Sequence, residues 1–476
     1  MKEMITLPND AVGTARAADP RTELFERAPI PRAVLSMCMP TILSSLVSVL
    51  YNLADTFYVG QLNEPIQNAA VTLAAPVLLA FYAFTNLFGV GSSSMMSRAL
   101  GAKDYKTIRR SSAFGFYMAF ICGSLYSLLV FIFHTPLLRL LGAGDDNISV
   151  TYDYMFWTVC LGAVPSILNI VFSYLVRSQG LAMHAGIGTM SGCVLNIIID
   201  PFFIMPWGLN MGAAGAGLAT FIANCIACLY FVILIFIKRK SCYVSLAPHD
   251  FRPTKEIVGG VFKVGIPAAV QNLLNVTGMT VLNNCAAAYG SMAVAAMGVA
   301  NKTTSVPMQI AFGISHGLQP LVGYNYASGN RKRMKKAILF ALGMAVGLLT
   351  TTAILYTIFA PNIIALFMKN SEIVKMGAAL QRGLCLAQPF MCVDFLCVGV
   401  FQACGMGHWS LLFAFLRKIV LEIPAIIILN RLFPMYGLAY AQPCAEFILC
   451  IVAVCFLVSI FRQGDRMTSK EEASLI

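Results

Sequence analysis

The sequence predicts an all-α integral membrane protein, with twelve transmembrane helices in two six-helix lobes related by a parallel pseudo-two-fold repeat. Three observations lead to this fold class. Of the 476 residues, 58% are hydrophobic and only 11% are charged, which is typical of chains that cross a bilayer many times. Apolar runs of membrane-spanning length recur along the chain, and Lys and Arg gather in every second connection. The two sides of a basic central linker also resemble each other.

The positions of the basic residues that give the net charge of +12 indicate the orientation of the chain in the membrane. Only four of the 33 Lys and Arg residues fall in the odd-numbered connections, and these are Arg139, Lys369, Lys375 and Arg431. Because basic residues favour cytoplasmic loops, the even-numbered connections and both termini are expected in the cytoplasm. The sequence therefore predicts a multi-pass protein of the cell membrane whose surroundings are lipid, and nucleic acid is not expected as a partner.

The same pattern divides the chain into five parts. We expect a cytoplasmic N-terminal tail at 1–30, an N-lobe at 31–237, a cytoplasmic linker at 238–256, a C-lobe at 257–461 and a cytoplasmic C-terminal tail at 462–476. Spans one to six fall in the N-lobe and spans seven to twelve in the C-lobe.

An internal repeat relates the two lobes. Equivalent residues are separated by nearly the same length of chain, and they are Pro40 and Pro267, Gly91 and Gly317, and Gly180 and Gly405. Each lobe has an even number of spans, so the second lobe starts on the same side of the membrane as the first. This is the parallel repeat of transporters in which two bundles rock around a central cavity.

The first span, Pro40 to Gly60, carries a carboxylate, Asp55, inside an apolar run. An Asp at the centre of a span costs roughly 2.5–3.5 kcal/mol on insertion scales, and such residues usually face a cavity or a partner. Tyr51 lies one helical turn earlier on the same face. One interpretation is a proton or cation site. The alternative is a packed helix in which a neighbouring hydroxyl satisfies the Asp.

Span five places a second polar pair on one helical face, because Asn196 and Asp200 are four residues apart. Pro201 follows, and a proline frees a backbone carbonyl one turn back. Asp200 therefore either faces a cavity with Asn196 or only serves the bend at the proline. Thr220, in span six, either bonds to its own helix or contributes a ligand.

Comparison of the two lobes separates residues that serve folding from residues that serve function. A polar residue needed for folding in both lobes would recur at the equivalent position. The equivalents of Asp55, Asn196 and Asp200 in the second lobe are instead Leu282, Leu421 and Ala425. This asymmetry favours a functional site in the N-lobe.

The second lobe has polar residues of its own within its spans. They are Lys302, Asp394, Arg417 and Glu422. Lys302 and Arg417 are expected to neutralise Asp394 and Glu422 as internal ion pairs. The alternative is a second cation or substrate site.

No enzyme, cofactor or structural metal is expected. The five histidines are scattered at positions 134, 184, 249, 316 and 408, without metal-ligand spacing. Most of the 15 cysteines lie in apolar runs, where Cys behaves as a small hydrophobe.

Four segments carry a family resemblance: LYNLADTFYVGQ in span one, SRALGAKD after span two, RSQG with LNIIIDP across spans four and five, and QPLVGYNYASGNRKR after span eight. Their order and spacing resemble the multidrug and toxic compound extrusion (MATE) family, most of all its MepA-like group near the DinF-like branch. The resemblance extends from about Pro31 to Ile460. It implies a cation-coupled exporter with two six-helix lobes and a V-shaped central cavity.

The resemblance also implies which residues form the cation-binding site. The N-lobe cation cluster of DinF-like members is matched by Tyr51, Asp55, Asn196, Asp200 and Thr220. Asp394 matches the span-ten carboxylate of the NorM-like branch. That branch also uses a Glu in span seven, where this sequence has no acid, so we place the coupling in the N-lobe.

The expected function is multidrug efflux by antiport with alternating access. Bulky apolar or cationic compounds would leave as H⁺ enters, or as Na⁺ enters and binds at Asp55, Asn196 and Asp200. Two carboxylates in one poorly hydrated cavity repel each other, which favours uptake of a proton or a cation. A monomer is expected. The alternatives are a lipid-linked precursor flippase of the same superfamily and, less favoured, an integral-membrane enzyme.

Overall fold

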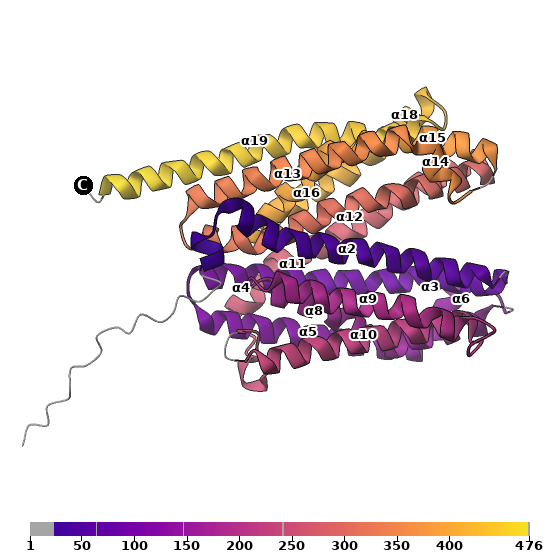
Figure 1. Ribbon diagram of the computed structural model, residues 1–476, viewed down its shortest axis with the longest axis horizontal. Coiled ribbons are helices and arrows are strands. Elements are labelled where there is room, and N and C mark those ends of the chain that lie inside the picture. The colour runs from indigo at the N-terminus through magenta and orange to yellow at the C-terminus, as the bar shows by residue number, and fades with distance from the viewer. Residues whose placement is uncertain (1–22, 63, 146, 240–241, 369, 475–476) are drawn as a thin grey trace, which may run out of the picture.

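The computed structural model describes residues 23–474, apart from 63, 146, 240–241 and 369. Every regular element within these ranges is a helix. The helices run side by side along one common direction (Figure 1). The expectation of an all-α protein is therefore confirmed.

The first half of the bundle opens with a short π-helical turn, η1 (Glu23–Arg27). Six rods follow, and two of them are interrupted by π-helical turns. In chain order the elements are α2 (Ile30–Gln61), α3 (Pro65–Phe84), η2 (Thr85–Val90), α4 (Gly91–Gly101), α5 (Tyr105–Ile132), α6 (His134–Leu140), α7 (Ile148–Met155), η3 (Phe156–Leu161), α8 (Ala163–Arg177), α9 (Ala182–Ile204) and α10 (Gly212–Ile237).

The second half repeats this order of rods after a linker that contains the 3₁₀ turn η4 (Pro248–Asp250). Its elements are α11 (Lys255–Ala287), α12 (Ser291–Ala327), α13 (Arg331–Ile358), α14 (Ala360–Ala365), α15 (Ser371–Cys385), α16 (Gln388–Ala403), α17 (Gly407–Phe415), η5 (Leu416–Glu422), α18 (Ile423–Leu432) and α19 (Gly437–Ser474).

The rods make twelve crossings of membrane length within the described ranges. Eight are rods that are long and apolar enough to span, of which seven are single helices and one is α3–η2–α4, and two more are bent pairs, α7–α8 and α15–α16. The remaining two crossings are less apolar. α12 is 37 residues long but rich in amide and hydroxyl side chains, and the rod α17–η5–α18 carries charged residues in η5.

The pseudo-two-fold relation appears in the bends and in the contacts. Spans four and ten, which are equivalent, both bend by 47°. At the equivalent glycines the halves also exchange contacts symmetrically. A Cβ on Gly91 of span two would lie 2.9 Å from Val261 Cγ1 of span seven, and one on Gly317 of span eight would lie 2.7 Å from Cys38 Cα of span one. Both crossings therefore depend on the missing side chain.

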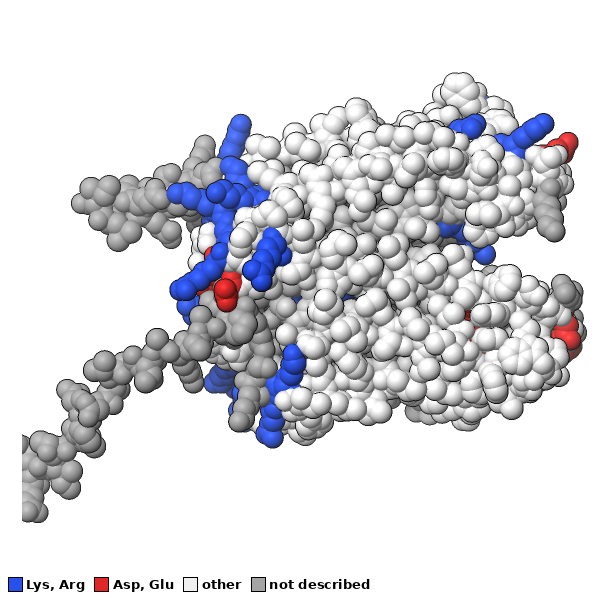
Figure 2. All heavy atoms as spheres, viewed as in Figure 1, with Lys and Arg blue, Asp and Glu red and all other residues white. Residues whose placement is uncertain are grey.

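The bundle has one basic end. In Figure 2 the Lys and Arg side chains gather at the end where α5 and α13 begin, and few lie at the other end. The C-terminal end of α19 points out of this basic end (Figure 1). The observed distribution has the asymmetry that the sequence predicted.

The two halves are closed against each other at the basic end and separated at the other. Near the basic end α2 packs on α12, and the Ser94 hydroxyl donates to the Gln402 carbonyl oxygen across the halves. At the opposite end Figure 2 shows the surface hollowed between the halves. The cleft thus opens away from the basic end.

Several helix ends lie away from the predicted boundaries. α2 begins at Ile30, so Pro40 is inside the helix and not at its start. Residues 23–27 of the predicted tail form η1, and the rest of that tail, 1–22, lies outside the described residues. α11 begins inside the predicted linker, and α19 continues past 461 to Ser474.

Candidate functional site

The predicted N-lobe cluster is brought together where α9 packs between α2 and α10. Thr220 of α10 is its centre. The Thr220 Oγ1 atom lies 3.4 Å from the Tyr51 hydroxyl of α2 and accepts a hydrogen bond of 3.3 Å from Asn196 Nδ2 of α9. Three helices are therefore joined by one chain of polar side chains. The Thr220 hydroxyl therefore bonds to side chains of two other helices, which does not support the interpretation that it bonds only to its own helix.

Three carboxylate oxygens of the cluster are buried without a hydrogen-bond donor among the described residues: both oxygens of Asp200 and Oδ1 of the half-buried Asp55. Asp200 is fully buried and Asn196 is 1% exposed. Within the described ranges no hydrogen-bond partner reaches either oxygen of Asp200, Oδ1 of Asp55 or Oδ1 of Asn196. Asp55 and Asp200 are close enough to repel each other electrostatically. Pro201 continues α9 to Ile204, directly after the unpaired Asp200.

Tyr154 is a member of this cluster that the sequence reasoning missed. It is 5% exposed on α7, and its hydroxyl is in electrostatic range of both Asp55 and Asp200. Gly217 of α10 allows this placement, since a Cβ there would lie 2.9 Å from the Tyr154 carbonyl oxygen. The sequence holds a signal for this contact, because the small residues from Gly212 to Gly217 are typical of a close helix packing, although they do not identify the partner helix.

This arrangement can bind a proton or a small cation. Ionised carboxylates and amide oxygens are acceptors, and buried acceptors are almost always satisfied in folded proteins. Four such oxygens converge here, and none of them receives a hydrogen bond from the described part of the chain. Oxygen ligands of this type suit hard cations. Tyr51 and Tyr154 are the nearby groups that could donate or release a hydrogen bond as the occupancy changes.

The polar residues of the second half are paired, but not as predicted. Arg417 bonds to Glu446 of α19, and both side chains are nearly inaccessible. Lys418 donates to both oxygens of Glu422, at 2.8 and 2.6 Å. The predicted ion pairs of Arg417 and Lys302 with Asp394 and Glu422 are not formed among the described residues, although Arg417 lies in electrostatic range of both carboxyl groups. Lys418 lies four residues before Glu422 on the same rod, while Arg417, one residue earlier, faces α19.

Asp394 and Lys302 lie apart. Lys302 is exposed and makes no ion pair with any residue that the structure describes. Asp394 is 1% exposed, beside Glu446 and in electrostatic range of Arg417, with no hydrogen-bond donor on either oxygen from the described residues. Arg417 also lies 4.4 Å above the Phe395 ring. Two carboxyl groups thus share one guanidinium in this half.

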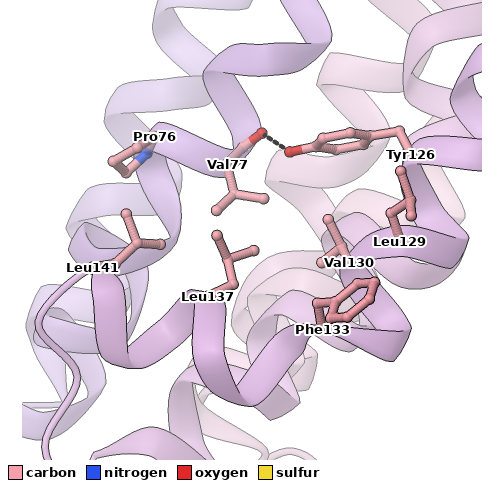
Figure 3. Close-up of a pocket in the computed structure, with 8 residues that line it drawn as sticks. All are labelled: Pro76, Val77, Tyr126, Leu129, Val130, Phe133, Leu137 and Leu141. Carbon is pink, nitrogen blue, oxygen red and sulfur yellow. Dashed lines mark hydrogen bonds between the residues drawn. The ribbon is translucent and has the colours of Figure 1, made fainter.

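A separate apolar cavity of about 450 Å³ lies between α3, α5 and α6. Figure 3 shows its lining, in which the Tyr126 hydroxyl donates to the Val77 carbonyl oxygen at 2.8 Å. Its lining consists of Pro76, Val77, Tyr126, Leu129, Val130, Phe133, Leu137 and Leu141. With no charged group in that lining, the cavity is not part of the carboxylate cluster.

Two pseudo-symmetric six-rod halves, a cleft between them and unpaired carboxylates inside one half define the class of membrane transporters with a parallel repeat. The MatE family model matches the chain twice, at residues 40–202 and 267–428, once in each half. The chain therefore belongs to the MatE family. The sequence resemblance to this family, and the internal repeat, are confirmed.

Curated relatives of this chain include multidrug export proteins named MepA. The protein from Staphylococcus saprophyticus is 31% identical over 451 residues, which cover 94% of this chain and 98% of the relative. The protein from Staphylococcus aureus strain MRSA252 is 32% identical over 453 residues, with the same coverage.

Solved structures share the fold over the whole chain. A crystal structure of a MATE protein in complex with MaL6 superposes with a TM-score of 0.88 at 24% identity, covering 94% of this chain and 99% of that one. A multidrug resistance MATE family transporter in an outward-facing conformation also gives 0.88, at 25% identity and with 94% and 98% covered. These likenesses confirm the fold class with twelve transmembrane helices in two lobes.

Proposed function

We propose that this protein is a multidrug efflux transporter that exchanges bulky apolar or cationic compounds for H⁺ or Na⁺ across the cell membrane. The observation that carries the coupling is the set of buried, donor-free carboxylate oxygens on Asp55 and Asp200. The compound class is supported by the export function named for the MepA relatives, which match along nearly their whole length.

A cation at the N-lobe cluster would remove an electrostatic cost. Two close carboxylates in a buried site repel each other, and binding of one proton or one sodium ion relieves that repulsion. Tyr51, Asn196 and Thr220 form one connected hydrogen-bond chain beside them. Occupancy of the site would therefore rearrange contacts among α2, α9 and α10.

The geometry of the two halves supports alternating access. α2 carries Tyr51 and Asp55, and the same helix packs on α12 of the other half near the basic end. A shift of α2 on cation binding would therefore act directly on the contact between the halves. Differential cation affinity of a few kcal/mol is enough to shift such a two-state equilibrium strongly.

The membrane orientation follows from the charges. If the basic end faces the cytoplasm, as the positive-inside rule requires, then the cleft opens outward and the described ends of the chain, at η1 and α19, are cytoplasmic. We propose this orientation in the cell membrane. We also propose that the functional unit is a monomer, because each chain contains both halves of the cleft.

The test is dye efflux from cells or reconstituted vesicles, with pH and sodium gradients imposed separately. The wild type is expected to extrude a cationic dye when at least one of the two gradients is imposed. Asp55→Asn is expected to lower gradient-driven efflux by at least about tenfold while the protein stays in the membrane, because the amide cannot take up a proton. Asp153→Asn is the matched control, since Asp153 is an exposed carboxylate on α7.

The gradient that drives efflux identifies the ion. Transport on the pH gradient alone would assign H⁺, and transport only on the sodium gradient would assign Na⁺ to Asp55, Asn196 and Asp200. Unchanged efflux in Asp55→Asn would contradict the N-lobe assignment. No gradient-coupled movement of any dye would instead favour a lipid-linked precursor flippase.

A further inference from the structure

A buried cation at the closed end of the cleft has no acidic partner among the described residues. Arg177 is the last residue of α8 and is 7% exposed. Its Nη2 donates to Ser173 Oγ at 2.9 Å, and its Nε is buried with no partner among the residues that the structure describes. The guanidinium also lies 5.5 Å from the centre of the Tyr174 ring.

An unpaired buried guanidinium is costly. Arginine keeps its proton in proteins, so it cannot escape the cost by becoming neutral. A buried charge is ordinarily paired and hydrogen-bonded. The titratable groups that act on Arg177 are Tyr174, Cys38 and His316, and no carboxylate of the described chain is among them. Some other negative charge would lower the energy of this site.

Arg177 lines a small polar cavity between the two halves. Its walls come from α4 and α8 of the first half and from α12 of the second, and they include Ser93, Ser94, Ser97, His316 and Gln319. The cavity has room for roughly one water-sized group. A chloride ion is slightly larger than a water molecule, so the walls would have to give by a few tenths of an ångström to admit it, whereas a drug is far too large.

The walls offer donors in place of acids. The Gln319 amide nitrogen is 3.3 Å from His316 Nδ1 and donates to Gln402 Oε1 at 3.0 Å. With Nδ1 accepting from that amide, His316 carries its proton on Nε2 as a donor. The Ser93 hydroxyl donates to the Val90 carbonyl oxygen of η2 and the Ser97 hydroxyl to the Ser94 carbonyl oxygen of α4, so each would rotate about χ1 to donate to a bound anion.

We propose that this cavity binds one small inorganic anion of the size of chloride, held by the guanidinium of Arg177 at the interface of the two halves. The anion would supply the missing counter-charge. Because the walls belong to both halves, the anion would stabilise the state in which this end is closed. The site is distinct from the carboxylate cluster, and its occupancy does not depend on the proposed antiport.

The test is the thermal stability of the full-length protein in detergent, at constant ionic strength, as gluconate is replaced by chloride. Constant ionic strength removes general screening. A ligand of the folded state raises the melting temperature, and above its Kd the rise continues with the logarithm of the ligand concentration. Wild type is expected to show this rise, and Arg177→Gln is expected to show none across the series. Sulfate is too large for the cavity and stabilises only by exclusion from the protein surface, so it is expected to act equally on both proteins.

Arg333→Gln is the matched control. Arg333 lies at the same end of the molecule, but its guanidinium is fully engaged, because it donates to the carbonyls of Leu24, Phe25 and Ala28. This variant is expected to melt at a lower temperature and to keep the chloride dependence. A chloride response that is absent in wild type, or equal in wild type and Arg177→Gln, would overturn the proposal.

A second measurement does not need any variant to fold. Crystals of the wild type grown with bromide in place of chloride are expected to show anomalous scattering beside the Arg177 guanidinium. Density at that position without an anomalous signal would mean that the cavity holds water alone, and it would overturn the anion site. Neither measurement involves transport, so failure of the antiport proposal would leave this result standing.

Discussion

Replacing Arg417 by Met should be one of the most destabilising single changes in the second half. The guanidinium is 5% exposed, bonds to the fully buried Glu446 and stacks on Phe395. Removing one partner of a buried pair leaves an uncompensated charge and costs about 3–5 kcal/mol. Here two carboxyl groups lose their guanidinium at once, because Asp394 lies beside Glu446. We therefore expect a loss toward the upper end of that range.

The double variant Arg417→Met with Glu446→Leu separates the cost of an unpaired buried charge from the cost of lost packing. Replacing a buried ion pair by apolar residues of similar volume is often neutral or stabilising, so the double variant should recover most of the loss. Arg139→Met is the control for an exposed pair. Arg139 lies 3.5 Å from Asp145 with side chains 67% and 94% exposed, and exposed pairs contribute below about 1 kcal/mol.

The assay is reversible unfolding in mixed detergent micelles, followed by circular dichroism. The free energies of unfolding of the three variants and the wild type form the comparison. The reasoning is refuted if Arg417→Met loses no more than Arg139→Met, or if adding Glu446→Leu to it deepens the loss by the cost of a second independent change.

Three further outcomes can be checked on the same preparations. Gly217→Ala should lower dye efflux, because its Cβ would lie 2.9 Å from a carbonyl oxygen of α7, whereas Gly343→Ala, with open space around it, should not. Asp104→Ala should cost about 0.5–2 kcal/mol, because Asp104 Oδ1 caps α5 by accepting from the Thr107 backbone N–H at 3.1 Å. Hydrogen bonds from Thr107 lower the pKa of Asp104, so this stabilisation is present above the unfolded-state pKa and is lost as the pH falls through the lowered value, which melting curves against pH would show. Asp394→Asn should leave efflux within about twofold of wild type, and a loss as large as that of Asp55→Asn would move the coupling into both halves.

The spans, the basic end and the repeat could be predicted because they rest on local features. Span length follows from apolar runs, and topology follows from the count of basic residues. The residues of the N-lobe cluster could also be predicted in part. Asn196 and Asp200 share a face by helical period, and Thr220 follows the stripe of small residues that brings α10 close.

The residues that sequence reasoning missed depend on which helices meet. Tyr154 lies in α7, which begins at Ile148, while the apolar run of span four starts only at Phe156. Glu446 is a single acid inside the long apolar run of α19, and its partner lies on another rod. The pairing of side chains across a bundle is set by the rotation of each rod, and a π-helical turn such as η5 changes that rotation locally.

Most buried carboxylates of the second half have a basic partner, whereas those of the first half do not, and this difference supports the proposed coupling in the first half. In the second half Lys418 neutralises Glu422 and Arg417 neutralises Glu446, so an incoming cation would find little unbalanced charge there beyond that of Asp394. In the first half Asp55 and Asp200 have no basic partner among the described residues. A cation gains most electrostatic energy where no counter-charge is already fixed, since a resident Arg or Lys would have to be displaced. We therefore propose that ion binding drives the change of shape from the first half, where the described residues form no buried ion pair.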